Sequence, residues 1–187
     1  MNFPMKKILI AAAALCLVAC QDNSAEKQVI QTTQTANATS VNAPSKAPAP
    51  APSPEYPTLT IKTFTGETFD LAKHREQWVV VNFWATWCGP CLKEIPDFNA
   101  FAKKRSDVQF IGLAYEEIER ADMDAFLKQH PIDYPFAILD VYNPPKDFET
   151  PRGLPMTVVI APGGKVAKTF LGPVDSNALL EVIGAKL

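Results

Sequence analysis

Two cysteines separated by two residues, Cys88 and Cys91, have the type and spacing in this chain best suited to chemistry. Thiols at this spacing can open and close a disulfide reversibly, which is a redox reaction. The run from Trp78 to Ala85 is apolar and rich in β-branched and aromatic residues, which predicts a buried strand, and the residues that follow Pro90 have the pattern of an amphipathic helix. The cysteine pair is therefore expected at a strand-to-helix turn.

The two cysteines are expected to have different roles. At a helix start, unpaired backbone N–H groups and the positive end of the helix dipole favour a thiolate. Cys88 lies at this position and is predicted to attack, whereas Cys91 lies about one turn deeper and is predicted to resolve. Cysteines in such a setting have pKa values of roughly 3.5 to 7.5, against about 8.5 for a free thiol.

Other interpretations of the pair are half of a zinc site, a structural disulfide or a Cys–His hydrolase. The further candidate ligands are His74, His130 and two N-terminal cysteines, none of them at zinc-ligand spacing. A disulfide that closes so short a loop constrains little of the unfolded chain. His74 is expected in a loop and His130 at a helix end, where a cation is ordinary. We therefore predict a redox-active disulfide with no metal or other cofactor.

The first 19 residues have the layout of a secretory signal. Lys6 and Lys7 precede an apolar stretch from Ile8 to Ala19, which is too short to span a bilayer. The tetrapeptide LVAC, which ends at Cys20, resembles the bacterial lipobox, in which cleavage before the cysteine precedes attachment of lipid to its sulfur. We expect a lipoprotein signal peptide over residues 1–19 and lipidation of Cys20; an ordinary secretory signal is the alternative.

Lipid on Cys20 would tether the protein to a membrane, because each buried CH₂ group contributes about 0.8 kcal/mol. We therefore expect the chain in the bacterial cell envelope, facing the periplasm. Gln21 follows the lipid site, and Asp22 stands one place later than an inner-membrane retention signal requires. This arrangement weakly favours the outer membrane but does not decide between the inner and the outer membrane. Cys16 would leave with the signal, so the mature protein would keep one dithiol.

Residues 20–57 are rich in Gln, Thr, Asn, Ala and Ser and end in an Ala-Pro repeat. With so few large apolar residues they cannot build a core, and we predict a lipid-anchored, disordered linker whose Pro-rich half is semi-rigid. Without the signal, the chain has 16 basic and 20 acidic residues, a net charge of about −4. This balance does not favour a nucleic-acid partner, and we expect a monomer.

Residues 58–187 have the size of one compact domain. The order of the expected elements, β-β-α-β-α-β-β-β-α, predicts an α/β fold with a mixed central sheet flanked by helices and an additional N-terminal strand. Pro162-Gly163-Gly164 is predicted to turn a hairpin between the last two strands. We expect strands at Leu59–Phe64, Trp78–Ala85, Val108–Tyr115, Phe136–Leu139, Met156–Ala161 and Val166–Leu171, and helices at Pro90–Lys104, Glu119–Gln129 and Ser176–Ala185.

From Val79 to Pro96 the sequence reads VVVNFWATWCGPCLKEIP, and this run resembles the thioredoxin superfamily. Within it, the chain is similar to the TlpA/ResA-like group of membrane-attached, exported thiol-disulfide oxidoreductases. The similarity covers essentially all of residues 58–187. It implies a thioredoxin-like fold in which Cys88 and Cys91 form the catalytic dithiol.

The resemblance also implies substrate-binding residues around the cysteines. Trp87, Gly89 and Pro90 match the motif, and Trp87 would shape the entrance. Leu154 and Pro155 look like the superfamily's cis-proline loop, which faces the two cysteines. A cis bond there would turn the backbone groups of Leu154 outward, where an extended substrate segment could pair with them by strand addition. A trans proline that merely opens a strand is the alternative.

A proton carrier for the deeper cysteine is expected at Glu94. Asn82 stands where thioredoxin has a buried aspartate that moves protons, and an amide cannot do so. Glu94 lies three residues after Cys91, and in the TlpA/ResA group a similarly placed glutamate serves the cysteines. Partial burial would raise its pKa towards a useful range. The alternative is a solvated glutamate paired with Lys93 or another neighbour.

Two features lie outside the motif. From Val141 to Pro151 the prolines argue against the helical segment that the family commonly carries, and Met156 stands where relatives often have Thr after the proline. Substrate choice is expected to differ accordingly. Glu116, Glu117 and Glu119 follow a predicted strand, and we expect them to form a solvated face and to place negative charge at a helix N-terminus.

The resemblance implies an exported protein-disulfide reductase whose substrates are oxidised exported proteins. The Gly-Pro dipeptide between the cysteines looks like that of thioredoxin and favours a reductant, which in an oxidising compartment needs a membrane thiol donor of the DsbD/CcdA type. Cytochrome c maturation and supply of a methionine sulfoxide reductase are the roles suggested. The alternatives are a thiol peroxidase, which the C-x-x-C with its intervening proline disfavours, and a non-catalytic lipoprotein adaptor, which would not reduce disulfides.

Overall fold

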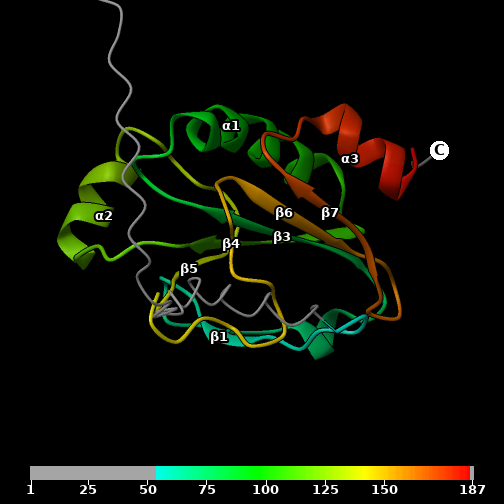
Figure 1. Ribbon diagram of the computed structural model, residues 1–187. Coiled ribbons are helices and arrows are strands. Elements are labelled where there is room, and N and C mark those ends of the chain that lie inside the picture. Colours follow the sequence, from blue (N-terminus) through cyan, green and yellow to red (C-terminus); the bar gives the residue numbers. More distant parts are fainter. Residues whose placement is uncertain (1–53, 186–187) are drawn as a thin grey trace, which may run out of the picture. The chain divides into compact units, whose positions relative to one another are not determined.

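The computed structural model describes residues 54–185, and the predicted signal peptide, Cys20 and most of the predicted linker lie outside this range. A five-stranded mixed sheet forms the centre of the described part, in the order β5-β4-β3-β6-β7 (Figure 1). β3 pairs in parallel with β4, β4 in parallel with β5, and β6 pairs antiparallel with both β3 and β7. The strands are β3 (Trp78–Trp84), β4 (Val108–Ala114), β5 (Phe136–Ile138), β6 (Met156–Ile160) and β7 (Val166–Leu171).

The helices α1 (Gly89–Lys104) and α3 (Ser176–Ile183) cover one face of this sheet (Figure 1). Their apolar side chains share a core cluster with Val80 of β3 and Phe110 of β4. The helix α2 (Arg120–Leu127) contributes Met123 to a second cluster, which also contains both cysteines. The predicted α/β fold with helices flanking a mixed sheet is therefore confirmed.

The opposite face of the sheet is covered by the N-terminal part of the domain. A separate two-stranded sheet pairs β1 (Thr60–Lys62) with β2 (Thr68–Asp70), and the 3-10 helix η1 (Leu71–His74) follows. Leu59, Phe69 and Leu71 pack from this part onto the central strands. The expected N-terminal strand is present, shorter than predicted, and β2 is a strand that the sequence pattern did not indicate.

Residues 54–57, which we assigned to the linker, contact the domain. The backbone N–H of Val166 donates to the carbonyl oxygen of Glu55 at 2.8 Å, Lys165 forms an ion pair with Glu55, and Pro57 is buried. Thr58 donates from its backbone N and its hydroxyl to Asp147 at 2.8 and 2.6 Å. Glu55 and Pro57 therefore contact the folded domain.

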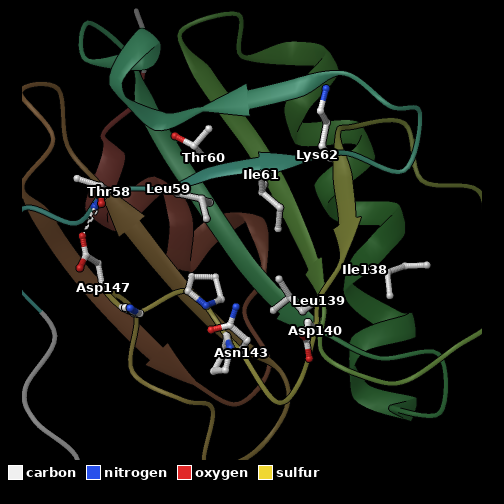
Figure 2. A pocket seen from close by; sticks show the side chains of 13 residues that line it. Thr58, Leu59, Thr60, Ile61, Lys62, Ile138, Leu139, Asp140, Asn143 and Asp147 are labelled. Carbon is white, nitrogen blue, oxygen red and sulfur yellow. Dashed lines mark hydrogen bonds between the residues drawn. The ribbon is translucent and has the colours of Figure 1, made fainter.

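The segment from Val141 to Pro151 contains turns and no helix, as its prolines predicted. Part of it borders a groove of about 660 Å³ whose opposite wall is β1 (Figure 2). The contact between Thr58 and Asp147 lies at one end of this groove. Neither cysteine lines the groove, so it is separate from the chemistry predicted for the cysteine pair.

Candidate active site

Cys88 and Cys91 form a disulfide at the start of α1. Cys88 is the N-cap residue of the helix, and its Sγ accepts a hydrogen bond from the backbone N of Cys91 at 3.3 Å. β3 ends at Trp84, four residues before Cys88, so the pair lies at the predicted strand-to-helix turn. The Cys91 N–H at the helix start is thus directed at the sulfur that is predicted to attack.

The disulfide has an apolar base and an exposed rim. Cys88 is 4% exposed and Cys91 1%, whereas the neighbouring Trp87 is 70% exposed. Gly89 and Pro90 are also exposed. The base is a core cluster formed by Trp84, Ala85, Ile95, Ala114, Met123 and Phe136. The buried disulfide is thus flanked along the chain by three exposed residues, Trp87, Gly89 and Pro90.

The cis-proline loop lies against this site. The peptide bond between Leu154 and Pro155 is cis. Leu154 is half-buried and packs against the cluster that contains both cysteines, and the carbonyl oxygen of Pro155 accepts from the backbone N of Gly172 at 2.9 Å. The structure thus brings Leu154 next to the cysteine cluster, although the loop lies more than 60 residues further along the chain.

Glu94 is buried on α1, three residues after Cys91, with 4% of its surface exposed. Its Oε1 accepts a hydrogen bond from the backbone N of Val174, and its Oε2 is buried with no hydrogen-bond partner among the described residues. Burial raises the pKa of Glu94 to about 7, and the Val174 N–H partly opposes this rise. The alternative of a solvated glutamate is therefore wrong, and Glu94 changes its charge near neutral pH.

Asn82 provides no comparable group. Its Nδ2 donates to the Oγ1 of Thr157 at 3.0 Å, and both side chains are buried. This pair links β3 to β6 without a group that titrates near neutral pH. Among residues 54–185 the buried carboxylates are those of Glu94 and Glu116.

Glu116 differs from the expected solvated face. It is 8% exposed, its Oε1 accepts from the backbone N of Thr86 at 2.7 Å, and its Oε2 accepts from the Thr86 hydroxyl at 2.8 Å. Glu117 and Glu119 are exposed, as expected. The prediction was wrong for Glu116 because its partner lies 30 residues away in sequence. The register of β3 and β4 is the feature that indicates this contact. Trp84 pairs with the last residue of β4, and Thr86 and Glu116 each lie two residues beyond that pair.

In residues 54–185, no three His, Cys, Asp or Glu side chains are grouped in a way that could hold a metal ion. The helices in the same range are too short or too polar to cross a membrane.

A family model described as Redoxin matches residues 45–183 of the chain. The thiol-disulfide oxidoreductase ResA of Bacillus cereus (strain ATCC 10987 / NRS 248) is 30% identical over 141 residues, which cover 74% of this chain and 80% of that protein. ResA of Bacillus subtilis (strain 168) is 29% identical over 125 residues, 66% of this chain and 69% of that protein.

Among solved structures, a thiol:disulfide interchange protein of the thioredoxin family from Chlorobium tepidum matches with a TM-score of 0.58 and 27% identity. The match covers 72% of this chain and 97% of the other. The thioredoxin-like architecture and the disulfide at the start of α1 agree with these matches. The chain belongs to the Redoxin family and is a thiol-disulfide oxidoreductase related to ResA.

Proposed function

We propose that this protein reduces disulfides of exported proteins in the bacterial cell envelope, where lipid on Cys20 holds it to a membrane. The observation that carries the proposal is the Cys88–Cys91 disulfide at the start of α1, next to the exposed Trp87. The names of the ResA relatives support a thiol-disulfide exchange activity. The lipobox-like LVAC sequence supports export and anchoring.

The first step is attack by Cys88. In the reduced enzyme its thiolate attacks one sulfur of a substrate disulfide, a new S–S bond forms, and the substrate's S–S bond breaks. The leaving sulfur departs as a thiolate and takes a proton from solvent. The N-cap position of Cys88 and the Cys91 N–H that faces its sulfur favour the attacking anion.

The second step is resolution by Cys91. Its thiol loses a proton to the Glu94 carboxylate and attacks the Cys88 sulfur of the mixed disulfide. The Cys88–Cys91 bond forms, the second substrate sulfur leaves as a thiolate and is protonated, and two electrons have moved from the enzyme to the substrate. A pKa of about 7 suits Glu94 to this task, because both its forms are populated at neutral pH.

The exposed rim supplies the substrate contacts in this proposal. Trp87 offers a large apolar surface beside the disulfide, together with exposed Gly89 and Pro90. The backbone of Leu154, next to the cis bond to Pro155, would pair with an extended segment of the substrate.

The direction of electron flow follows from the dipeptide between the cysteines. Gly89-Pro90 is the pair that thioredoxin carries, and thioredoxin is a reductant with a potential of about −270 mV. The oxidised enzyme would be reduced again by a membrane thiol donor of the DsbD/CcdA type. Cytochrome c maturation or the supply of a methionine sulfoxide reductase would use such electrons.

Reduction of insulin by dithiothreitol, followed by turbidity, tests the activity. We expect the protein to accelerate the reaction and Cys88→Ser to abolish the acceleration. Cys91→Ser should form mixed disulfides with its substrates, which mass spectrometry of adducts from intact cells would identify. A wild-type protein without catalysis, or catalysis that survives Cys88→Ser, would contradict the proposal.

A further inference from the structure

One carboxylate, that of Glu116, holds the loop that carries the nucleophile. Glu116 lies two residues beyond the end of the neighbouring strand β4. β3 ends at Trp84 and α1 is capped by Cys88, so three residues separate the strand from the reactive sulfur. Thr86 is the middle one of these three. Both of its hydrogen-bond donors, the backbone N–H and the hydroxyl, donate to Glu116, at 2.7 and 2.8 Å.

This contact is the second of two links between the loop and the end of β4. The backbone N of Tyr115 donates to the carbonyl oxygen of Trp84 at 2.8 Å, which extends the β3–β4 pairing by one residue. Glu116 continues the link on Thr86 through its side chain. Because both carboxylate oxygens are used, Thr86 is fixed in direction as well as in position.

Trp87, the residue after Thr86, has few other restraints, whereas Cys88 is buried in the apolar cluster and bonded to Cys91. Trp87 is 70% exposed, so packing holds it weakly, and the backbone N of Cys88 donates to the carbonyl oxygen of Ala85 at 3.1 Å, within the same loop. A rotation at Thr86 would therefore turn the side chain of Trp87 directly, and it would strain the backbone that joins Thr86 to the buried Cys88.

We propose that Glu116 is a positioning residue of the active site: its paired hydrogen bonds to Thr86 set the loop geometry that aligns Cys88 with Cys91 and directs Trp87 towards the substrate. The proposal rests on the proposed thiol-disulfide exchange. Glu116 contacts neither cysteine in this role and acts through Thr86.

Three variants separate position from charge. Glu116→Ala removes both hydrogen bonds. Glu116→Gln removes the charge and can keep both contacts, because its amide oxygen accepts from the Thr86 N–H and its amide nitrogen donates to the Thr86 hydroxyl. Thr86→Val removes the hydroxyl contact alone. Glu119→Ala, an exposed glutamate three residues further on, is the matched control.

Equilibration with glutathione reports the alignment of the two cysteines and needs no protein substrate. Oxidised enzyme and two glutathione molecules exchange with the dithiol and one glutathione disulfide. If Glu116 aligns the cysteines, Glu116→Ala should favour the dithiol, changing the equilibrium constant by about fivefold or more, and should lower kcat/KM for insulin reduction by about tenfold. Glu116→Gln should stay within about threefold of the wild type in both measurements, and Glu119→Ala should match it.

The double variant Thr86→Val with Glu116→Ala should be no worse than Glu116→Ala alone, since both changes remove parts of one contact. Wild-type values for Glu116→Ala, even with lower thermal stability, would overturn the proposal. So would equal effects of the Gln and Ala variants, or additive effects in the double variant. If Glu116→Ala does not fold, Thr86→Val decides. Its glutathione equilibrium should be shifted towards the dithiol relative to the wild type, and an unshifted equilibrium would overturn the proposal. A wild-type enzyme that fails to reduce insulin while Glu116→Ala still shifts the glutathione equilibrium would refute the proposed function and leave the positioning role standing.

Discussion

The ionisation of Glu94 should make the stability of the oxidised protein depend on pH. Burial raises its pKa from 4.5 to about 7. The native state favours the neutral form of Glu94. The stability that this preference contributes is therefore fully present below about pH 4.5 and is lost as the pH rises through 7. Up to about 3 kcal/mol of unfolding free energy is at stake. Urea unfolding of the wild type and of Glu94→Gln across this range should show their stabilities diverging with rising pH in favour of the Gln variant.

Asp97 provides the control for this measurement, because it is an exposed carboxylate on α1. Together with Glu94 it lines a second surface groove, apart from the one beside β1, whose other wall includes Val174. Asp97→Asn should keep the pH dependence of the wild type. Parallel curves for wild type and Glu94→Gln would show that Glu94 does not titrate differently in the native state.

Glu94 should also affect turnover. If it takes the proton of Cys91, Glu94→Gln should lower kcat/KM for insulin reduction by about 10²-fold and remove an inflection near pH 7. Asp97→Asn should retain both the rate and the inflection. A Glu94→Gln enzyme with the wild-type pH profile would assign the proton transfer to another group.

The sequence was sufficient to predict those site residues that lie close together along the chain. Cys88, Cys91 and Glu94 lie within seven residues on one helix, so spacing and resemblance place them together. The burial of Glu94 also depends on Val174, 80 residues away. The contact of Glu116 with Thr86 joins two loops and could be found only from the register of β3 and β4.

Within β4, Gly112 is required by packing. A Cβ atom there would lie 3.0 Å from the Cβ of Phe136, 3.0 Å from the indole nitrogen of Trp84 and 3.2 Å from the ring of Tyr134. Gly112→Ala should therefore lower the unfolding free energy by about 1–3 kcal/mol in urea titrations. Gly153→Ala, whose Cβ would approach only one atom within 4 Å, at 3.9 Å, should change it by less than about 1 kcal/mol. Equal costs for the two variants would contradict this account of the packing.

The strands with long apolar runs were predictable, and the short strand β2 was not. The seven residues of β3 and of β4 are almost all buried and gave clear apolar runs, and the Gly163-Gly164 turn between β6 and β7 has both glycines at positive φ, as the hairpin prediction requires. β2 has three residues, of which only Phe69 is buried, so no alternation is visible. Its formation depends on pairing with β1 and on packing against the sheet.

For the molecule as a whole, the boundary of the domain is testable. A chain that begins at Thr58 lacks the hydrogen bond from Val166 to Glu55 and the burial of Pro57. Relative to a chain that begins at Pro54, we expect its unfolding free energy to be lower by about 1–2 kcal/mol. Glu55→Gln in the longer chain should leave the stability close to that of the unchanged longer chain, because the exposed ion pair with Lys165 contributes little. Equal stability of the two chains would place the boundary at Thr58.

The most direct test of the account is the pH dependence with which iodoacetamide alkylates Cys88 in the reduced Cys91→Ser variant, where the described part of the chain has no other thiol. We predict that the rate reaches half its maximum below about pH 7.5, because the helix start stabilises the thiolate. A midpoint at or above about pH 8.5, the value of a free thiol, would contradict an attacking role for Cys88.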